Sequence, residues 1–228
     1  MTGYLAWRGH LSRATLWRVV RGSGEHRVLP DGVMDLMVHR GRFVVAGADT
    51  AAWHDAESEP GEVTWGLRLP PGAACAVLGL PANELTDQRI DLADLVELPA
   101  PALDAAELDA PAALERVFVA LWRRTSPDVP TLRLAASLDR AARGGATVRE
   151  VADRHGLSER SLRRASDRLF GYGPKTLMSI HRFQYALQLA NAGVALGEAA
   201  ATAGYADQAH LNREARRLAD ATPTALVR

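Results

Sequence analysis

The sequence has 228 residues but a single cysteine, and its basic and acidic side chains are equal in number. Cys75 alone can form neither an internal disulfide nor a cysteine-based zinc site, and its apolar neighbours AACAVLGL predict a buried, inert thiol. No apolar run approaches the roughly 20 residues of a membrane-spanning helix, which argues against a membrane protein. The first residues, MTGYLAWRGHLSR, do not resemble a signal peptide, so we expect a cytoplasmic protein.

Motifs for metal binding and catalysis are also missing. Histidines on one strand of a metal-binding barrel normally stand at His-x-His spacing, and the chain contains no such pair. There is no clustered catalytic triad and no phosphate-binding loop. The first half does hold several scattered histidines and acids, namely His10, His26, His39, His54, Asp31, Asp35, Glu57 and Glu59. We expect no metal, no cofactor and no enzymatic activity.

The zero net charge hides an asymmetry between the two halves. Residues 1–125 contain 12 arginines and 17 acidic residues, a net charge of −5, whereas residues 126–228 contain 15 basic and 10 acidic residues, a net charge of +5. Opposite signs are expected if only the second half binds a polyanion such as DNA, although chance segregation would give the same pattern.

The segment TVREVADRHGLSERSLRRASDRL, residues 147–169, predicts two short helices joined by a sharp turn. Thr147 and Glu150 have capping-box spacing, Gly156 suits the left-handed residue that ends the first helix, and Ser158 can cap the second. The second helix has an apolar stripe, and its arginines lie outside that stripe. This pattern is typical either of a helix that enters the DNA major groove or of a solvated amphipathic helix.

A second copy of the unit favours the DNA interpretation. With Ser158 aligned on Asp207, Leu162 falls on Leu211 and Leu169 on Leu218, each with an offset of 49 residues. A turn at residues 204–205 separates the two helices of this copy. Tandem helix-turn-helix units joined by one long helix can enter two successive major grooves if they lie about one DNA turn, roughly 34 Å, apart.

These units resemble the DNA-binding domain of the AraC/XylS family of transcription regulators. The resemblance rests on GLSERSLRRASDRLFGYGPKTLMSIHRFQYALQLA, on AGYADQAHLNREARRL and on the closing TPTAL. The upstream segments RVLPDGVMDL, VAGADT and LRLPPGAACAVLGLPANELTDQRIDLADL resemble the small β-rich N-terminal half of actinobacterial-type members, which has no assigned ligand. The resemblance implies a regulator that binds double-stranded DNA, with contact to RNA polymerase and a homodimer as further implications.

The same resemblance assigns roles to exposed residues of the second helix in each unit. It implies that bases are read by Arg160, Arg163, Arg164, Gln208, Ala209, Asn212 and Arg213. It implies contacts with the DNA backbone by Ser161, Arg168, Lys175, Thr176, His210 and Arg217. Arginine suits guanine, and glutamine or asparagine suits adenine. Ala209 departs from the polar residue common in the family and suits contact with a thymine methyl.

The first hundred residues read mostly as short strands. Runs rich in valine, leucine and tryptophan, separated by glycine, proline or aspartate, lie at Thr15–Arg21, Arg27–Leu29, Met34–Val38, Arg42–Ala46, Glu62–Leu69 and Ala74–Leu78, before a short helix at residues 80–85. Such runs suggest a barrel or a sandwich, and the resemblance favours a barrel. The expected fold class is therefore α+β, with an N-terminal cupin-like β-barrel followed by an all-α tandem helix-turn-helix domain.

An effector pocket is a hypothesis for this β-rich half. Four of the five tryptophans lie in the first 65 residues. An aromatic barrel mouth with a few polar groups is a common site for small molecules, but tryptophans also fill the core of small domains. The candidate pocket residues are Trp17, Asp31, Asp35, Trp53 and Trp65. Pro30-Asp31-Gly32 is first a turn and only second a ligand contact.

A connector separates the predicted halves. Residues 112–124 place Leu114, Val117, Phe118, Leu121 and Trp122 at amphipathic-helix spacing. That apolar face either packs against its own barrel or pairs two copies of the chain. We expect a sensor or dimerisation domain at 1–98, a connector at 99–130 and the DNA-binding domain at 131–228.

The sequence therefore predicts a sequence-specific DNA-binding transcription regulator controlled by a small-molecule effector. Two alternatives remain. One is a DNA-binding protein without an effector, whose front half only assembles or contacts partners. The other is an enzyme fused to a DNA-binding domain.

Overall fold

The strands of the N-terminal half follow from alternating apolar and polar residues. In β4 (Asp35–His39), Leu36 and Val38 are buried while their neighbours are partly exposed, which is the pattern of a strand with one face on a core. The other strands are β1 (Gly3–Arg8), β2 (Thr15–Val20), β3 (Arg27–Val28), β5 (Arg42–Ala46), β6 (Trp53–His54), β7 (Val63–Arg68) and β8 (Arg89–Asp91). This computed structural model describes residues 3–23, 26–54, 59–98 and 109–227.

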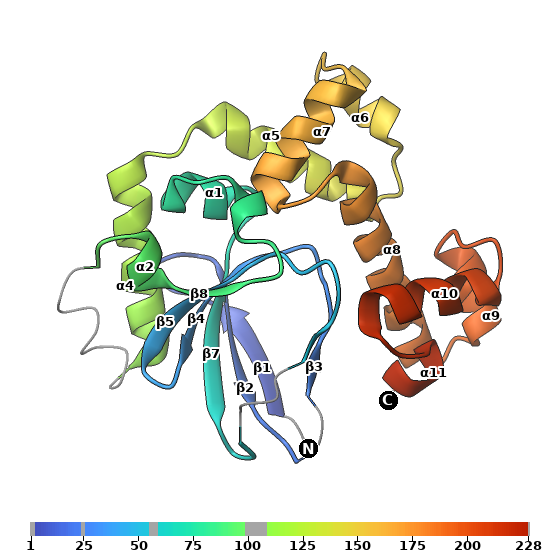
Figure 1. The fold of residues 1–228 in the computed structure, drawn as a ribbon, viewed down its shortest axis with the longest axis horizontal. Helices are drawn as coiled ribbons and strands as arrows, with labels where there is room; N and C mark the ends of the chain where they lie inside the picture. Colours follow the sequence, from blue (N-terminus) through green and yellow to red (C-terminus); the bar gives the residue numbers. More distant parts are fainter. Residues whose placement is uncertain (1–2, 24–25, 55–58, 99–108, 228) are drawn as a thin grey trace.

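Six of the strands form one antiparallel sheet in the order β1-β2-β7-β4-β5-β8, and β3 pairs with β6 in a separate ribbon. Within the described residues, β1 and β8 each have one neighbour, so the strand order is that of an open sheet. Leu16 and Leu36 both oppose Leu67 on one face, which is apolar. Trp17 opposes Gly66 on the other face. The predicted α+β class, with a β-rich half before a helical half, is confirmed (Figure 1).

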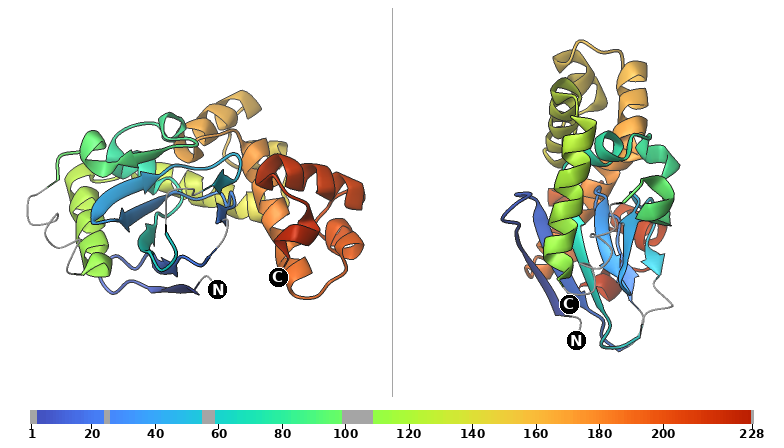
Figure 2. Two further views of the ribbon diagram at one scale, coloured as in Figure 1. Left: turned by 60° about the horizontal axis from the view of Figure 1, so that its bottom comes forward. Right: turned by 90° about the vertical axis from the view of Figure 1, so that its left-hand side faces the viewer.

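Helix α4 (Ala110–Thr125) lies across the apolar face of this sheet (Figure 2, right). Its residues Leu114, Val117, Phe118 and Leu121 are buried in the core shared with α1 (Ala73–Leu78) and β7. The amphipathic helix therefore packs within its own chain, and its apolar face is not free to pair two copies. Residues 99–108 of the predicted connector lie outside the described residues.

One predicted strand is wrong. Residues 74–78 belong to the helix α1, whose two flanking residues, Gly72 and Gly79, have left-handed backbone with φ of 76° and 74°. A short apolar run has no periodicity that separates a buried strand from a buried helix, and the two glycines were the better signal. The structure also adds β1, β6 and β8, which the sequence pattern did not predict. Every residue of β1 is exposed, so no inside and outside pattern marks it.

The short predicted helix is present as η1 (Ala82–Glu84), followed by α2 (Leu92–Leu95). The helical half consists of α5 (Val129–Arg143), α6 (Val148–Arg154), α7 (Glu159–Phe170), α8 (Pro174–Asn191), α9 (Leu196–Thr202), α10 (Gln208–Ala219) and α11 (Pro223–Leu226). Cys75 is buried and unpaired, as predicted. None of the helices in the described ranges has both the length and the apolar character needed to cross a bilayer.

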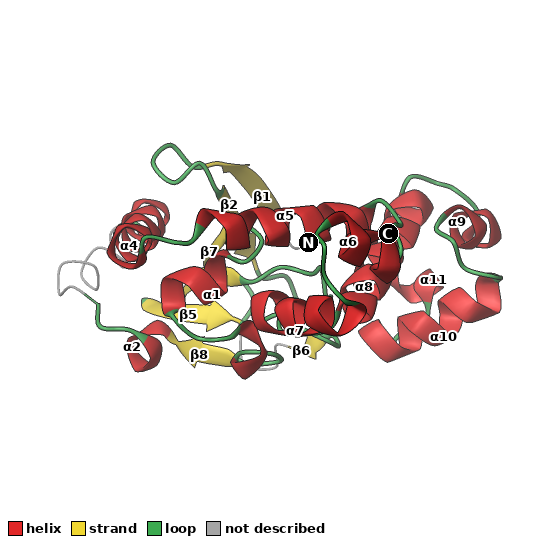
Figure 3. Cartoon of the chain, turned by 90° about the horizontal axis from the view of Figure 1, so that it is seen from above, coloured by secondary structure: helices red, strands yellow, loops and turns green. Residues whose placement is uncertain are grey.

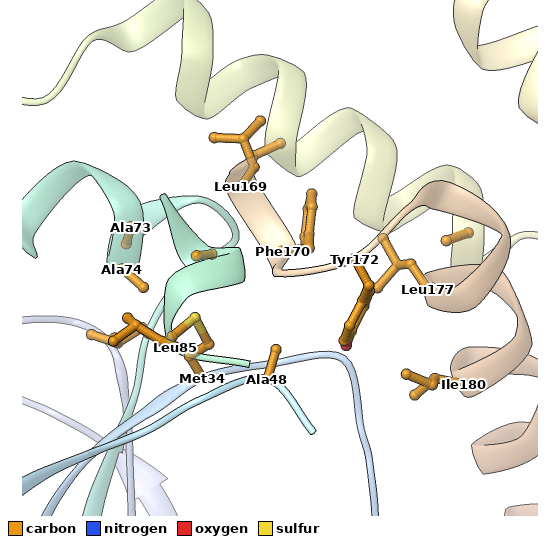
Figure 4. Packing of buried hydrophobic residues seen from close by; sticks show 14 of the residues in the cluster. Met34, Ala48, Ala73, Ala74, Leu85, Leu169, Phe170, Tyr172, Leu177 and Ile180 are labelled. Carbon is orange, nitrogen blue, oxygen red and sulfur yellow. The ribbon is translucent and has the colours of Figure 1, made fainter. Parts of the chain in front are cut away.

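The two halves share one apolar core (Figure 4). Met34, Ala48 and Leu85 from the β-rich half lie near Phe170 and Leu177 from the helical half, in a single cluster of buried residues. A hydrogen bond of 2.9 Å from Thr86 Oγ1 to the carbonyl oxygen of Gly171 crosses the same junction. The first helix-turn-helix unit is thus held directly on the N-terminal half.

A buried carboxylate ties the β1–β2 hairpin to α4. Glu115 is 7% exposed, and its Oε1 accepts hydrogen bonds from the backbone N–H groups of Leu11 at 3.0 Å and Ser12 at 2.7 Å and from the Ser12 hydroxyl at 2.7 Å. Gly9 passes so close to Glu115 that a side chain there would collide with the carboxylate. Burial disfavours the charged form, but the hydrogen bonds from Ser12 and Leu11 outweigh it and lower the pKa of Glu115.

We expect Glu115→Gln to lower the free energy of unfolding at pH 7 by about 1–3 kcal/mol, because a neutral amide oxygen is a weaker acceptor than the carboxylate and the amide NH2 adds a buried donor. The matched control is Glu84→Gln, at an exposed glutamate, which is expected to change little. Urea unfolding measures both.

The same pair of variants has a predicted pH dependence. The pKa of Glu115 is lower in the folded chain than its ordinary value of 4.5, so its contribution to stability is present above that value and is lost as the pH falls through the folded pKa. The difference in free energy of unfolding between the wild type and Glu115→Gln should therefore become smaller at low pH. A difference that stays constant with pH would contradict this role of the carboxylate.

Candidate nucleic-acid interface

The first helix-turn-helix unit is built by local capping. Glu150 Oε2 accepts a hydrogen bond of 2.7 Å from Thr147 N–H, and Thr147 Oγ1 accepts one of 3.2 Å from Glu150 N–H. These reciprocal bonds start α6 at Val148 as predicted. Gly156 has a φ of +62°, which lets the chain turn sharply before Ser158 caps α7 by accepting a hydrogen bond of 3.1 Å from Ser161 N–H.

Helix α7 separates an apolar face from an arginine face. Leu162, Leu169 and Phe170 are buried against the rest of the chain. The four arginines predicted to lie outside this stripe are all exposed, namely Arg160, Arg163, Arg164 and Arg168. Arg163 lies 3.9 Å from Asp167 in a solvent-exposed pair. The other three guanidinium groups make no hydrogen bond or ion pair within the described residues, so they are available to an anionic partner.

The second unit repeats this geometry, as the 49-residue offset predicts. Gly204 has a φ of +82°, and Asp207 caps α10 by accepting a hydrogen bond of 2.6 Å from His210 N–H. Leu211 and Leu218 are buried like their counterparts in α7. Among the predicted base-reading residues, Gln208, Ala209 and Arg213 are exposed and Asn212 is partly exposed.

Helix α8 joins the two units and holds each of them (Figures 1 and 3). On one side His181, which is 5% exposed, contacts Asp139 of α5 through a Nε2 to Oδ1 distance of 3.0 Å. On the other side Arg182 lies over the ring of Tyr205 at 4.4 Å. Ser179 donates a hydrogen bond to Glu214 of α10. Side chains of α8 thus hold α5 on one side and the second helix-turn-helix unit on the other.

The residues predicted to contact the DNA backbone differ in their exposure and in the contacts that they already make within the chain. Ser161, Arg168 and Lys175 are exposed, and Thr176 is partly exposed. The ring of His210 packs edge-on against Tyr205, with centroids 5.1 Å apart. The guanidinium of Arg217 is hydrogen-bonded to both oxygens of Glu214, at 2.9 and 3.0 Å, so it must leave or share this carboxylate to reach a phosphate. Glu214 lies three residues before Arg217 on the same helix, a spacing that favours such a pair, whereas the bond from Ser179 to Glu214 joins two distant segments of the chain.

Three of the five predicted effector residues come together in the β-rich half. Trp17 Nε1 donates a hydrogen bond of 2.8 Å to Asp35, and Arg68 donates one of 2.6 Å to Asp31. The same guanidinium lies 3.9 Å from Asp35. Sequence reasoning missed Arg68 and also Tyr4, whose ring stacks on Trp17 at 6.4 Å. Both were hidden because they belong to other strands.

The pKa values of the carboxyl groups in this cluster are shifted by burial and by neighbouring charges. Burial, together with the charge of neighbouring Asp35, raises the pKa of Asp31 to about 6 in spite of the favourable charge of Arg68. Burial also raises the pKa of Asp35, against the opposing effects of Arg68 and the Trp17 N–H group. Clusters of this kind are candidates for functional sites.

The remaining two tryptophans lie elsewhere. Trp65 is on the opposite face of the sheet from Trp17, where its ring meets Trp7 edge-on at 6.1 Å. Trp53 stacks on Arg89, 4.5 Å from the guanidinium to the ring centre, and Arg89 pairs with Asp49. Trp53 therefore borders the acidic cluster through Arg89, whereas Trp65 does not reach it.

A small cavity of about 20 Å³ lies at the junction of the two halves, between Gly32, Pro71, Gly72, Leu169 and Phe170. It has room for about one water molecule.

Two family models match separate parts of the chain. Residues 131–228 match a family model described as a helix-turn-helix domain. Residues 13–91 match a domain of unknown function (DUF6597). No curated protein matches the chain.

Solved structures of ToxT from Vibrio cholerae share a general similarity with the chain. ToxT bound to an unsaturated fatty acid is 9% identical over 99% of this chain and 94% of that chain, with a TM-score of 0.48. ToxT bound to (E)-4-(8-methylnaphthalen-1-yl)but-3-enoic acid is 8% identical over 99% of this chain and 97% of that chain, with a TM-score of 0.49. A similarity at this level does not indicate what the present chain binds.

We expect the contact between Asp139 and His181 to stabilise the packing of α5 on α8. In a double-mutant cycle with Asp139→Asn and His181→Asn, the coupling energy should be about 1–2 kcal/mol, because each substitution leaves the other buried group without its partner. Asp153→Asn, at an exposed aspartate of α6, provides the control. A coupling energy near zero would show that this contact does not stabilise the packing of α5 on α8.

Proposed function

We propose that this chain, whose residues 131–228 form a helix-turn-helix domain of the AraC type, is a sequence-specific transcription regulator that binds double-stranded DNA. The observation that carries the proposal is the repeat of two capped units, each with guanidinium groups on its exposed face. Such groups match the edges of guanine and the charge of phosphates.

The spacing of the units fits this target. Helix α8 has 18 residues and is therefore about 27 Å long at about 1.5 Å per residue. Units at its two ends can reach successive major grooves, which are about 34 Å apart on one face of DNA. The net charge of +5 on residues 126–228 favours the same partner.

Within this proposal the exposed side chains have two roles. Arg160, Arg163 and Arg164 of α7 read bases in one groove, and Gln208, Ala209, Asn212 and Arg213 of α10 read bases in the next. Ser161, Arg168, Lys175, Thr176, His210 and Arg217 contact the DNA backbone. Backbone contacts set register and affinity without selecting a sequence.

The N-terminal half completes the regulator. We assign residues 1–98 to effector sensing, 99–130 to a connector and 131–228 to DNA binding. The cluster of Trp17, Asp31 and Asp35 supports control by a small molecule, since it gathers polar and aromatic groups on one face of the sheet. Location in the cytoplasm and contact with RNA polymerase belong to the same proposal. Pairing of two copies would need a surface other than the buried face of α4.

The enzyme alternative has less support. The matched C-terminal domain is a helix-turn-helix domain, and among the described residues there is no group of three histidine, cysteine or acidic side chains placed to hold a metal. A DNA-binding protein whose N-terminal half has no effector remains the second candidate, and the experiments below separate it from the first.

We expect Arg164→Ala and Arg213→Ala each to weaken binding to a selected operator by about 1–3 kcal/mol and to relax sequence preference in one groove. The operator is first obtained by selection from random duplexes, and affinity is then measured by fluorescence anisotropy. Arg116→Ala, at an exposed arginine of α4 in the N-terminal half, is the control and should leave affinity unchanged. Wild-type affinity in both test variants would refute the assignment of α7 and α10.

Loss of a phosphate contact should change DNA binding differently from loss of a base contact. Arg168→Ala should weaken binding to all sequences alike and reduce the slope of log K against log salt concentration by roughly 0.9, because one fewer phosphate is neutralised. Sequence preference, measured by competition with mismatched operators, should not change. A loss confined to one operator would instead place Arg168 at a base.

A further inference from the structure

Acidic groups outnumber basic ones at the cluster on the polar face of the sheet. Asp31, Asp35 and Asp49 influence one another electrostatically, and they are opposed by Arg68 and Arg89. When all three carboxyl groups are ionised, they exceed the two guanidinium groups by one negative charge. Asp87 adds to the negative potential at Asp49. The side chains of Asp31 and Arg68 are 35% and 39% exposed, so solvent reaches this end of the cluster, whereas those of Asp35 and Asp49 are 16% and 10% exposed.

Aromatic rings border these carboxylates. Tyr4 stacks on Trp17 with an angle of 28° between the rings, and Trp17 is hydrogen-bonded to Asp35. Gly66 lies directly beneath the Trp17 ring, which has no room for a side chain at that position. Carboxylates beside aromatic faces attract an organic cation through charge and through the ring quadrupole together.

One polar group at the edge of this cluster has no partner. Tyr172, in the turn between α7 and α8, is 6% exposed, and its hydroxyl makes no hydrogen bond within the described residues. Figure 4 shows the hydroxyl pointing toward the chain segment that carries Ala48, the residue that precedes Asp49 in the sequence. Burial raises the pKa of Tyr172, and the charges of Asp31 and Asp49 raise it further. A buried hydroxyl is normally hydrogen-bonded, so a missing partner is expected here.

From these observations we propose that Asp31, Asp35 and Asp49, with the aromatic rings of Tyr4 and Trp17 and the hydroxyl of Tyr172, form a binding site for a small organic ammonium ion. An ammonium N–H group donates to a carboxylate and to the Tyr172 oxygen, and its carbon part lies against the rings. The excess negative charge disfavours an anion.

The same site is connected to α8 by one short turn. Asp31 lies in the turn of residues 30–34, where its second contact is the Val33 N–H group. The carbonyl oxygen of Pro30 accepts a hydrogen bond of 2.5 Å from Gln184 of α8. Gly32, with a φ of +83°, lies against His181, where an added Cβ would be 2.8 Å from Cε1. A cation that draws Asp31 away from Arg68 therefore moves the turn on which α8 rests.

This inference rests on the proposed function, because it names the effector class and the route by which the effector changes DNA binding. A ligand changes DNA affinity only by its different affinity for two arrangements of the protein. Here the two arrangements differ in the turn at residues 30–34 and in its contacts with Gln184 and His181.

The first test measures binding to the full chain without DNA. Benzylammonium is compared with benzyl alcohol and benzoate, which have similar shape but neutral or negative charge, by thermal unfolding and titration calorimetry. We expect the cation alone to raise the unfolding temperature of the wild type. Equal effects of all three compounds, or no effect at millimolar concentration, would overturn the proposal.

Two variants locate the site. Tyr172→Phe should weaken benzylammonium binding about fivefold, the equivalent of one hydrogen bond, while the ligand-free protein becomes equally or more stable because an unsatisfied buried hydroxyl is removed. Asp35→Asn keeps an acceptor for Trp17 but should weaken binding about tenfold or more through loss of charge. Tyr185→Phe, at an exposed tyrosine of α8, is the control. Wild-type affinity in Tyr172→Phe and Asp35→Asn would place the cation elsewhere.

A second test separates this inference from the proposed function. Arg213→Ala should lose operator affinity yet bind benzylammonium as the wild type does. Gln184→Ala should bind benzylammonium normally, but operator affinity should respond less to the cation than in the wild type. Cation binding that leaves operator affinity unchanged would refute the connection through the turn, whereas a chain that binds the cation but no DNA would refute the proposed function alone.

Discussion

The structure depends on one helix, α8, that must satisfy three partners at once. Its residues contact α5 through His181, the second helix-turn-helix unit through Arg182 and Ser179, and the N-terminal half through Gln184. A helix packed on several sides has few alternative positions, since protein interiors are close-packed. The spacing of the two arginine-bearing helices is thus a property of the whole chain, and the N-terminal half takes part in setting it.

Local sequence signals predicted the helical half well, because capping and helical spacing act over a few residues. Thr147 with Glu150, Ser158 and Asp207 cap the helices as expected. The β-rich half was harder, since apolar runs have the same composition in a strand and in a buried helix. Residues 74–78 illustrate this, and the exposed strand β1 lacks the alternation that would reveal it.

The site residues also divide into those that local sequence signals predict and those that depend on the fold. Exposed arginines of α7 could be placed from helical spacing alone, whereas contacts between distant segments could not. Arg68 meets Asp31 across 37 residues, and Glu115 meets Ser12 across 103 residues. The burial of the Tyr172 hydroxyl without a hydrogen-bond partner depends on how the two halves of the chain pack together. Pairings of this kind arise from the fold, so a sequence shows the participants without their partners.

The continuous apolar core restricts how the proposed effector can act. Phe170, Leu169 and Leu177 are buried at the junction, and exposing even one such side chain costs about 1.5–3 kcal/mol. Full separation of the halves would expose several, which exceeds the 1–3 kcal/mol that allosteric coupling typically supplies. Two hydrogen bonds also join the halves, from Thr86 to Gly171 and from Gln184 to Pro30, and each contributes about 1 kcal/mol net. A change in the position of α8 is therefore energetically accessible if these hydrogen bonds are exchanged while the apolar core stays intact.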